Sequence, residues 1–417
     1  MTEKKPAIKS IEPHHHRVWV IDPDPATTTA VTSLLREAGY QAETMALPPT
    51  PLNREALPDL LVLTAAPQNY RRCLQLTTAG TTRHLPVIMV GLPNQPVDPD
   101  QAFMVKATDV VANGLQTAEL LSRVKTQLQL RHTEQQLAQQ AAALESLAAR
   151  LQNELAVAQN IQRGLLPPPS PNWSGLEVEC YTQSAREVGG DFYTYYAFDS
   201  RLQRNMRRYA IAIGDVSGKG MPAALLMAIS LASFKNLITQ VYSLNKLVAD
   251  LVTQTYSLSQ FLADLDRDIA FYTATTRQNC ALVYVEISQP ADTTKPVTLR
   301  TVNAGCMMPI VRRADGAVEW VEVGGMPLGA GLGGQLGYHE ERLSLNQGDM
   351  IILTSDGVVE ANNSHHEMLG FEQLEAIVRA GPPAGAKAML NHIRAQVDAF
   401  VGNTEPHDDQ TIVVVQL

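Results

Sequence analysis

Apolar and polar residues follow three different patterns along the chain. Between residues 16 and 127, short apolar runs alternate with amphipathic stretches, and the clearest runs are "RVWVID", "DLLVLT" and "LPVIMVG". Continuous apolar runs of this length are typical of parallel strands that are buried on both faces. The stretch "ATTTAVTSLLREAGY" has a helical period and is closed by Gly39. The alternation predicts a doubly wound α/β domain over residues 16–127.

Residues 128–166 follow a seven-residue repeat instead. The segment contains no Pro or Gly up to residue 162, so we expect one long helix. The apolar positions of the repeat are Leu130, Leu137, Leu144, Leu151, Ala158 and Leu165. The intermediate positions are weaker, because only Leu147 and Ile161 are apolar there. Two interpretations remain open: a coiled-coil linker that joins two copies of the chain, or a single surface helix on its own domain.

The prolines of "LLPPPSPNW" end this helix, and many short strands with few helices follow over residues 167–417. The clearest helices are "AALLMAISLASFKNLI" and "FEQLEAIVRA". The clearest strands are "RYAIAIG", "NCALVYVEIS", "VTLRTVNAG", "AVEWVEVG", "DMIILTS" and "DQTIVVVQL". This pattern predicts an α+β layered domain, in which helices cover antiparallel sheets.

Composition narrows the class of protein. A chain of 417 residues that is 45% apolar and 18% charged is globular and long enough for two or three domains. The formal net charge of −9 argues against nucleic-acid binding, which needs clustered Lys and Arg. The four cysteines form no metal-type pair and fit free thiols in a reducing compartment. No apolar run of signal-peptide or membrane-spanning length stands out, so we expect a cytoplasmic protein that does not contact a membrane.

Acidic residues stand at the ends of several predicted strands in the third zone. They are Asp191, Asp215, Asp356 and the pair Asp408–Asp409. Any one of them is typical of an ordinary Asp–Gly turn. If the sheet brings them together, their charges repel, and a hard divalent cation is the natural counter-charge. The sequence therefore predicts a Mn²⁺ or Mg²⁺ site, because zinc prefers His or Cys.

Two other kinds of site fit the segment "GDVSGKG" less well. A nucleotide-binding P-loop needs one more residue between its glycines, and Gly220 stands where Ser or Thr is required. Ser217 lacks the surroundings of a serine nucleophile. The glycines more plausibly give room beside Asp215, and two metal ions sharing a carboxylate are able to clamp a phosphate and activate water.

Seven ordered motifs give a specific resemblance. They are "VGGDFY", "IGDVSGKGMPAALLMA", "NAGCMMP", "MPLGAG", "GDMIILTSDGVVEANN", "LGFEQL" and "DDQTIVVV". From residue 154 to residue 417 the chain resembles the bacterial PPM-type (type 2C) Ser/Thr protein phosphatases of the SpoIIE/RsbU group. The resemblance implies two antiparallel sheets flanked by helices, a β-sandwich with two Mn²⁺ or Mg²⁺ ions between the sheets.

The same resemblance assigns roles to residues of this chain. Asp215 would bridge both ions, Asp356 and Asp408 would complete one shell, and Asp191 would serve the second ion. The backbone carbonyl of Val216 would be a further ligand. These four aspartates are the candidate catalytic residues. The implied substrate is a phosphorylated protein, with an anti-sigma-factor antagonist of the STAS type as the family's example.

Two departures leave questions open. Cys306 in "NAGCMMP" stands where the family usually has His, which puts activity or substrate fit in question. An additional stretch over residues 255–277 is a lid, a partner surface or a longer loop. A catalytically inactive scaffold that binds the same kind of partner is the alternative function.

The first zone contains the motifs "VWVIDPDP", "PDLLVLTAAP", "LPVIMVGLP" and "TDVVANGLQTAELLSRV". Through these weaker motifs it resembles the receiver domain of response regulators, which has a flavodoxin-like fold. Thr64 stands at the phosphoacceptor position, Gly91 at the switch hydroxyl position and Asn113 at the lysine position. Of the acidic pair only Asp22 remains, because Pro23 replaces its neighbour. A threonine hydroxyl does not form the acyl phosphate. The resemblance therefore implies a pseudo-receiver that regulates the phosphatase as a binding or dimerisation module, with homodimers joined through the coiled coil.

Overall fold

The computed structural model describes residues 12–23, 25–46, 57–112, 116–198, 206–248, 256–292 and 295–417. The chain divides into two compact units, Met1–Ala149 and Arg150–Leu417. The division falls inside a single long helix, α4 (Thr117–Leu165). Asn113, which the sequence places at the receiver lysine position, lies outside the described residues.

The first unit contains one five-stranded parallel sheet in the order β2-β1-β3-β4-β5. Its strands are β1 (Arg17–Ile21), β2 (Gln41–Met45), β3 (Leu60–Thr64), β4 (Val87–Val90) and β5 (Asp109–Val111). Its further helices are η1 (Pro13–His15), α1 (Pro25–Glu37), α2 (Pro67–Thr78) and α3 (Pro99–Met104). The start of α4 and α1 cover one face, and α2 and α3 cover the other. The predicted doubly wound α/β fold is confirmed.

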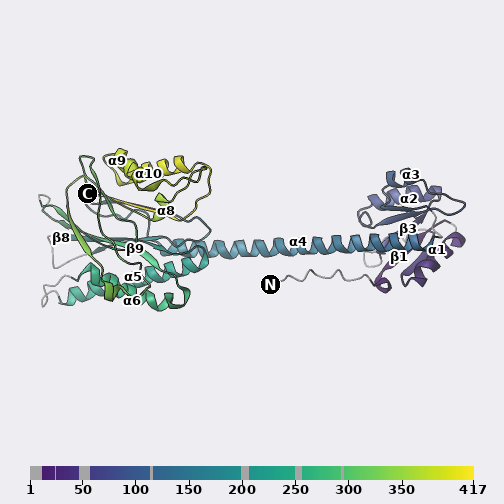
Figure 1. Ribbon diagram of the computed structural model, residues 1–417, viewed down its shortest axis with the longest axis horizontal. Coiled ribbons are helices and arrows are strands. Elements are labelled where there is room, and N and C mark those ends of the chain that lie inside the picture. The colour runs from purple at the N-terminus through teal and green to yellow at the C-terminus, as the bar shows by residue number, and fades with distance from the viewer. Residues whose placement is uncertain are drawn as a thin grey trace. The chain divides into compact units, whose positions relative to one another are not determined.

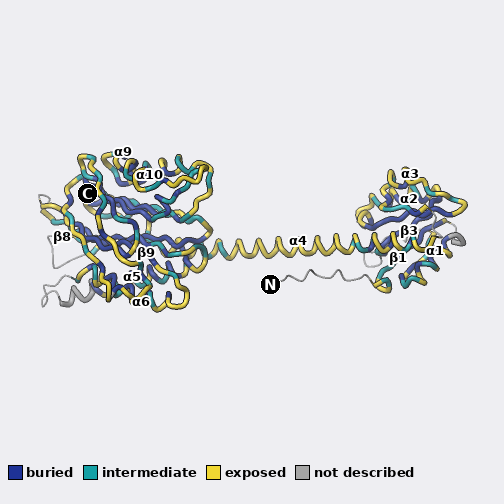
Figure 2. Tube along the Cα trace, viewed as in Figure 1, coloured by how far each residue is buried: buried dark blue, intermediate teal, exposed yellow. Residues whose placement is uncertain are grey.

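Helix α4 is continuous: the segment 117–130, which has a helical pattern of its own, runs without a break into the heptad region. Its first turns are buried in the sheet's core through Leu120, Val124 and Leu128. Figure 2 shows that the middle of the helix is exposed along its length. The exposed apolar side chains there are Leu130, Leu137, Leu144, Leu147, Leu151, Val157, Ile161 and Leu165.

The second unit is built on two five-stranded sheets (Figure 1). The first has the order β13-β10-β9-β8-β7: β7 (Phe192–Phe198), β8 (Met206–Val216), β9 (Cys280–Pro290), β10 (Val297–Ala304) and β13 (Glu340–Leu345). The second has the order β12-β11-β14-β15-β6: β6 (Glu177–Gln183), β11 (Ile310–Arg312), β12 (Val318–Trp320), β14 (Met350–Thr354) and β15 (Gln410–Gln416). All neighbouring strands are antiparallel.

Helices cover the outer face of each sheet, so the unit has four layers. Helices α5 (Met221–Val248) and α6 (Leu258–Thr276) cover the first sheet, and α9 (Gly370–Ala380) and α10 (Ala386–Val401) cover the second. Two short helices, α7 (Gly333–Leu336) and α8 (Asp356–Val359), lie in the connections. Aliphatic side chains from both sheets fill the space between them, including Val283, Val285, Ile351 and Val413. The predicted α+β layered fold is confirmed.

Part of α5 is unusually apolar. By length and composition alone, Met221–Val241 is sufficient to cross a membrane, although we expected no run of that kind from the sequence. Its side chains Ala223, Met227, Phe234 and Ile238 are buried in the core between α5, α6 and the first sheet. The apolar composition is thus accounted for by packing within this unit.

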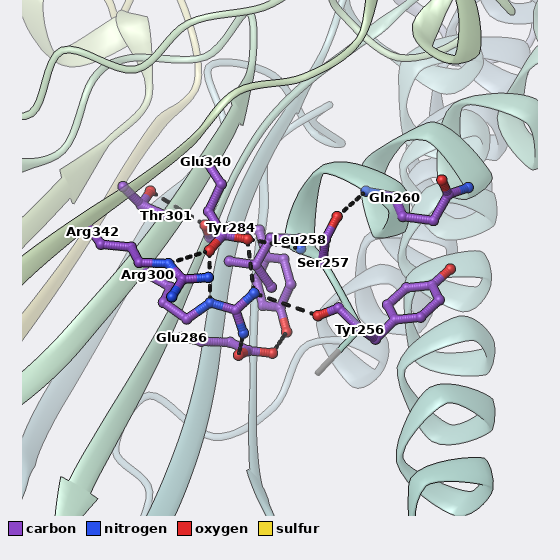
Figure 3. Close-up of polar contacts among 10 residues, drawn as sticks. All are labelled: Tyr256, Ser257, Leu258, Gln260, Tyr284, Glu286, Arg300, Thr301, Glu340 and Arg342. Carbon is purple, nitrogen blue, oxygen red and sulfur yellow. Dashed lines mark hydrogen bonds and ion pairs between the residues drawn. The ribbon is translucent and has the colours of Figure 1, made fainter. Parts of the chain in front are cut away.

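The stretch 255–277 forms a packed helix, α6, where it is described, so the interpretation as a longer loop is wrong. The start of α6 is fixed to the first sheet by the buried residue Arg300 on β10 (Figure 3). Arg300 donates to Glu286 over 3.0 Å and to Glu340 over 2.7 Å, and Glu340 in turn accepts from the backbone N–H of Leu258. Further along α6, Asp266 accepts hydrogen bonds from the backbone of Gly329, Gly331 and Gly333.

Candidate active site

Strand register brings the first two predicted site residues together. Strands β7 and β8 pair so that Phe192 lies opposite Gly214, which places Asp191 opposite Asp215 at the strand ends. The apolar run "YAIAIG" buries β8 up to Gly214, and the chain then leaves the sheet through "VSGKG". A side chain at Gly214 would collide with the ring of Phe192, so glycine is required for this pairing.

The other two aspartates come from the second sheet. Strand β14 ends at Thr354, and Asp356 opens the short helix α8 immediately after it. Asp408 immediately precedes Asp409, just before β15, the strand that pairs with β14. A side chain at Gly357 would collide with the backbone carbonyl of Asp409, so glycine lets these two turns approach each other.

The four carboxylates interact electrostatically. The pKa of Asp191 is well above its usual range because of burial and the neighbouring charge of Asp215. The pKa of Asp215 is raised to about 7 by burial, with Asp356 and Asp408 adding repulsion. Burial and the charge of Asp408 also raise the pKa of Asp356. Each of the four aspartates that the sequence singles out therefore lies within electrostatic reach of at least one of the others.

Asp409 has a different role from its neighbour Asp408. It is 6% exposed, and its carboxylate accepts backbone hydrogen bonds from Ala185 over 2.7 Å and from Gly190 over 2.6 Å. The backbone N–H of Asp191 donates, over 3.4 Å, to Oδ2 of Asp409, the oxygen that also accepts from Gly190. Asp409 thus fixes the backbone of the loop that carries Asp191. The sequence motif shows a pair of aspartates but does not distinguish these two roles.

Lys219 is a site residue that sequence reasoning missed. Its ammonium lies 3.1 Å from the carboxylate of Asp408 and also donates to the backbone carbonyl of His407. Gly218 and Gly220 on either side have positive φ angles of 96° and 75°, which let the loop turn Lys219 toward Asp408. The signal in the sequence is the lysine between two glycines in "GKG", to which the sequence patterns assign no role.

The donor set fits a hard divalent cation. It consists of carboxylates, and one buried oxygen of Asp191, Oδ2, has no hydrogen-bond partner. The backbone carbonyl of Val216 lies close to Gly190, because a Cβ added at Gly190 would lie 2.5 Å from the carbonyl oxygen of Val216. Among the described residues, no three His, Cys, Asp or Glu side chains are already assembled as an ion site.

Cys306, the residue at the family's usual His position, is close to these carboxylates. Its backbone N–H donates to the Asn303 side chain over 2.8 Å, and the Asn303 amide donates back to the Cys306 carbonyl over 2.9 Å. The pKa of the thiol is raised by burial and then by the charges of Asp215 and Asp191. A neutral thiol at this position adds no positive charge to the site.

The corresponding edge of the first unit differs. Asp22, which follows β1, is 1% exposed and accepts a hydrogen bond from the Thr64 hydroxyl at the end of β3. The amide of Asn69 on α2 donates to the Thr64 hydroxyl and to the carbonyls of Ile21 and Thr64. Asp22, Thr64 and Asn69 therefore bond to one another and to the backbone at this edge of the sheet.

Comparisons with known proteins agree with this geometry. The sequence profile of the family described as Stage II sporulation protein E (SpoIIE) matches residues 205–417. The phosphoserine phosphatase RsbU of Bacillus subtilis (strain 168) is 23% identical over 280 residues, 66% of this chain and 72% of that protein. The phosphoserine phosphatase RsbP of the same organism is 26% identical over 214 residues, 51% of this chain and 46% of RsbP. This chain thus matches less than half the length of RsbP.

Among solved structures, the SiaA-PP2C domain of Pseudomonas aeruginosa has a TM-score of 0.50. It is 17% identical, and the match covers 65% of this chain and 98% of that domain. Two antiparallel sheets flanked by helices, with carboxylates where the sheet ends meet, define a PP2C-like phosphatase fold. Because the profile covers 213 of 417 residues, just over half, the chain belongs to the SpoIIE family of PPM-type serine/threonine phosphatases.

Proposed function

We propose that the chain hydrolyses phosphoserine or phosphothreonine in a partner protein, with two Mn²⁺ or Mg²⁺ ions as cofactors. The observation that carries the proposal is the buried Asp191 next to the half-buried Asp215, with Asp356 and Asp408 beside them and no cationic side chain paired with Asp191 or Asp215 among the described residues. When bound, two such ions neutralise phosphate charge and activate water for an in-line displacement. The proposed ligands are the four carboxylates and the backbone carbonyl of Val216.

The chain's own residues then position the reacting groups. The Asp409 carboxylate accepts from the backbone N–H groups of Gly190 and Asp191, and this fixes the position of the backbone that carries the Asp191 side chain. The Lys219 ammonium, 28% exposed, orients Asp408 and keeps a positive charge at the mouth of the site. Arg186 is exposed five residues before Asp191 and is a candidate for binding the substrate phosphate.

The proposed substrate is a phosphorylated anti-sigma-factor antagonist of the STAS type. The support is the motif resemblance and the similarity to two proteins whose names state phosphoserine phosphatase activity. Because identity to both is below one third, the partner is an inference from likeness, and fold alone does not determine it.

We further propose that the receiver-like first unit regulates the phosphatase and that α4 joins two copies of the chain in a coiled coil. The support is the row of exposed leucines along α4 at seven-residue spacing. Light scattering of the purified chain should give the mass of a dimer. Leu137→Glu and Leu144→Glu together should give a monomer, whereas Gln139→Glu, off the apolar seam, should not. A wild-type monomer at high concentration would refute the coiled coil.

The catalytic proposal is tested by phosphate release from a phosphoserine protein with and without Mn²⁺. We expect turnover that requires Mn²⁺ and falls about a thousandfold or more in Asp215→Asn, because the bridging ligand is lost. Cys306→His is the companion variant and should retain Mn²⁺-dependent turnover. If Mn²⁺ neither supports turnover nor raises the melting temperature of the wild type, the metal site is refuted and the inactive scaffold is favoured.

A further inference from the structure

A cavity of about 610 Å³ opens at the amino-terminal edge of the sheet in the first unit. Four basic residues, from β1, from the connection between α2 and β4, and from α4, line it: Arg17, Arg83, His84 and Arg131. Asp59, just before β3, is the one carboxylate among the described residues that line it. The cavity lies at the edge opposite to Asp22 and Thr64, because all five strands are parallel.

The described residues that line this cavity carry a net positive charge. The Asp59 carboxylate accepts from the backbone N–H of Arg17 over 3.0 Å and lies 3.5 Å from the His16 ring. One carboxylate therefore stands against three guanidinium groups. Within the described part of the chain, the exposed Arg83 side chain makes no hydrogen bond or ion pair. A concave surface of one sign concentrates ligands of the opposite charge.

Arg131 adds a donor that lacks an acceptor. One end of its guanidinium donates to the backbone carbonyls of Pro58, over 3.3 Å, and Asp59. Its Nε is buried and has no hydrogen-bond partner. Burial lowers the pKa of Arg131, and the charge of Asp59 offsets this only in part. An unpaired buried N–H of a charged group is costly, because it has lost its hydration without gaining an acceptor.

We propose that this cavity binds a small phosphorylated ligand, held by Arg83 and Arg131. The guanidinium group matches phosphate oxygens in geometry and charge. The volume falls within the range of small-molecule sites. In doubly wound folds, ligands usually bind at the carboxyl edge of the sheet. In this unit, the side chains of Asp22, Thr64 and Asn69 hydrogen-bond to one another at that edge. Binding at the opposite edge does not depend on the phosphatase function.

The position of Arg131 connects the cavity to α4. It follows Leu128, which is buried in the core of the first unit, and Leu130, which is the first exposed leucine of the heptad row. A phosphate bound at Arg131 therefore acts where the helix leaves the sheet. Because the proposed regulation runs through α4, this consequence, unlike the binding itself, rests on the proposed function.

Isothermal titration of the full chain with inorganic pyrophosphate, in buffer free of divalent cations, tests the binding. We expect wild type and Arg71→Gln to bind equally, because Arg71 is an exposed arginine of α2 that does not line the cavity. Arg83→Gln should weaken binding at least about tenfold, as expected for losing one charge-assisted hydrogen bond. Equal binding by Arg83→Gln and wild type would overturn the proposal.

Hydrogen exchange with and without pyrophosphate locates the bound anion. Protection should appear at residues 57–59, 80–84 and 128–135. Protection confined to residues 150–417 would refute the site. Phosphatidylcholine vesicles with and without phosphatidic acid separate a lipid headgroup from a free ligand: vesicle binding without pyrophosphate binding, lost in Arg83→Gln, assigns the headgroup. No binding of either probe would overturn the proposal.

Discussion

The first sheet of the phosphatase unit carries two groups of buried carboxylates that differ in their counter-charge. Glu286 on β9 and Glu340 on β13 both bond to Arg300 on the strand between them (Figure 3). Burial would raise the pKa of Glu340, but the bonds from Arg300 prevail and lower it to about 2. At the other edge of the sheet, burial and mutual repulsion raise the pKa of Asp215 to about 7.

The difference shows where the fold balances its own charge and where it does not. Arg300 closes the first group, and Figure 3 shows the contacts that extend from it to the start of α6. In the second group, Lys219 forms an ion pair with Asp408. One oxygen of Asp191 has no hydrogen-bond partner. An unbalanced buried charge costs stability, and this imbalance is the physical support for the cation site that we propose.

The largest effect should follow from removing the balancing cation. Arg300→Met removes the guanidinium that pairs with both Glu286 and Glu340, and we expect a loss of about 3–5 kcal/mol in the free energy of unfolding, measured by urea denaturation. The matched control is Arg342→Gln. Arg342 also donates to Glu340, over 2.9 Å, but its side chain is 68% exposed. An exposed pair contributes about 0–1 kcal/mol, and equal losses in the two variants would contradict this explanation.

The strands of the second unit show which parts of the fold are predictable from sequence. Strands β9, β14 and β15 each contain a buried, mainly apolar run, and they were predicted. Strand β13, "EERLSL", was not, because it is a mostly exposed edge strand whose residues are polar. Helix α6 was also missed: its sequence includes Asp264, Asp266 and Asp268, and only the folded chain shows that Asp266 holds a glycine loop.

An intermediate effect should separate the adjacent residues Asp408 and Asp409. Asp409→Ala removes the acceptor for the backbone of Ala185 and Gly190, and we expect a loss of about 2–4 kcal/mol in unfolding free energy. Asp408→Asn should leave stability within about 1 kcal/mol, because its carboxylate is 30% exposed, yet abolish Mn²⁺-dependent phosphate release. The assignment fails if Asp409→Ala is as stable as Asp408→Asn.

The candidate site was predictable in part, because some of its residues stand in recognisable strand-end motifs. Aspartates at strand ends with adjacent glycines mark positions where strands meet, and the motifs gave Asp191, Asp215, Asp356 and Asp408. The ion pair of Lys219 was not predictable, because it depends on two positive φ angles in the loop. The role of Asp409 depends on backbone N–H groups that converge from a distant loop, and a linear sequence does not show that convergence.

The smallest effect gives the sharpest comparison, because the same type of substitution should change stability in opposite directions on one sheet. In buffer with a chelator, Asp215→Asn removes a charge that repels Asp191 and Asp356, so the free energy of unfolding should rise by about 1 kcal/mol. Glu286→Gln replaces a carboxylate that accepts from Arg300 over 3.0 Å, so the same measurement should fall by about 1–2 kcal/mol. Added Mn²⁺ should then stabilise the wild type and not Asp215→Asn, because binding to the folded state adds to its stability. If both substitutions lower the free energy of unfolding by the same amount, the carboxylate of Asp215 does not repel those of Asp191 and Asp356. The physical argument for a cation beside Asp215 would then fail.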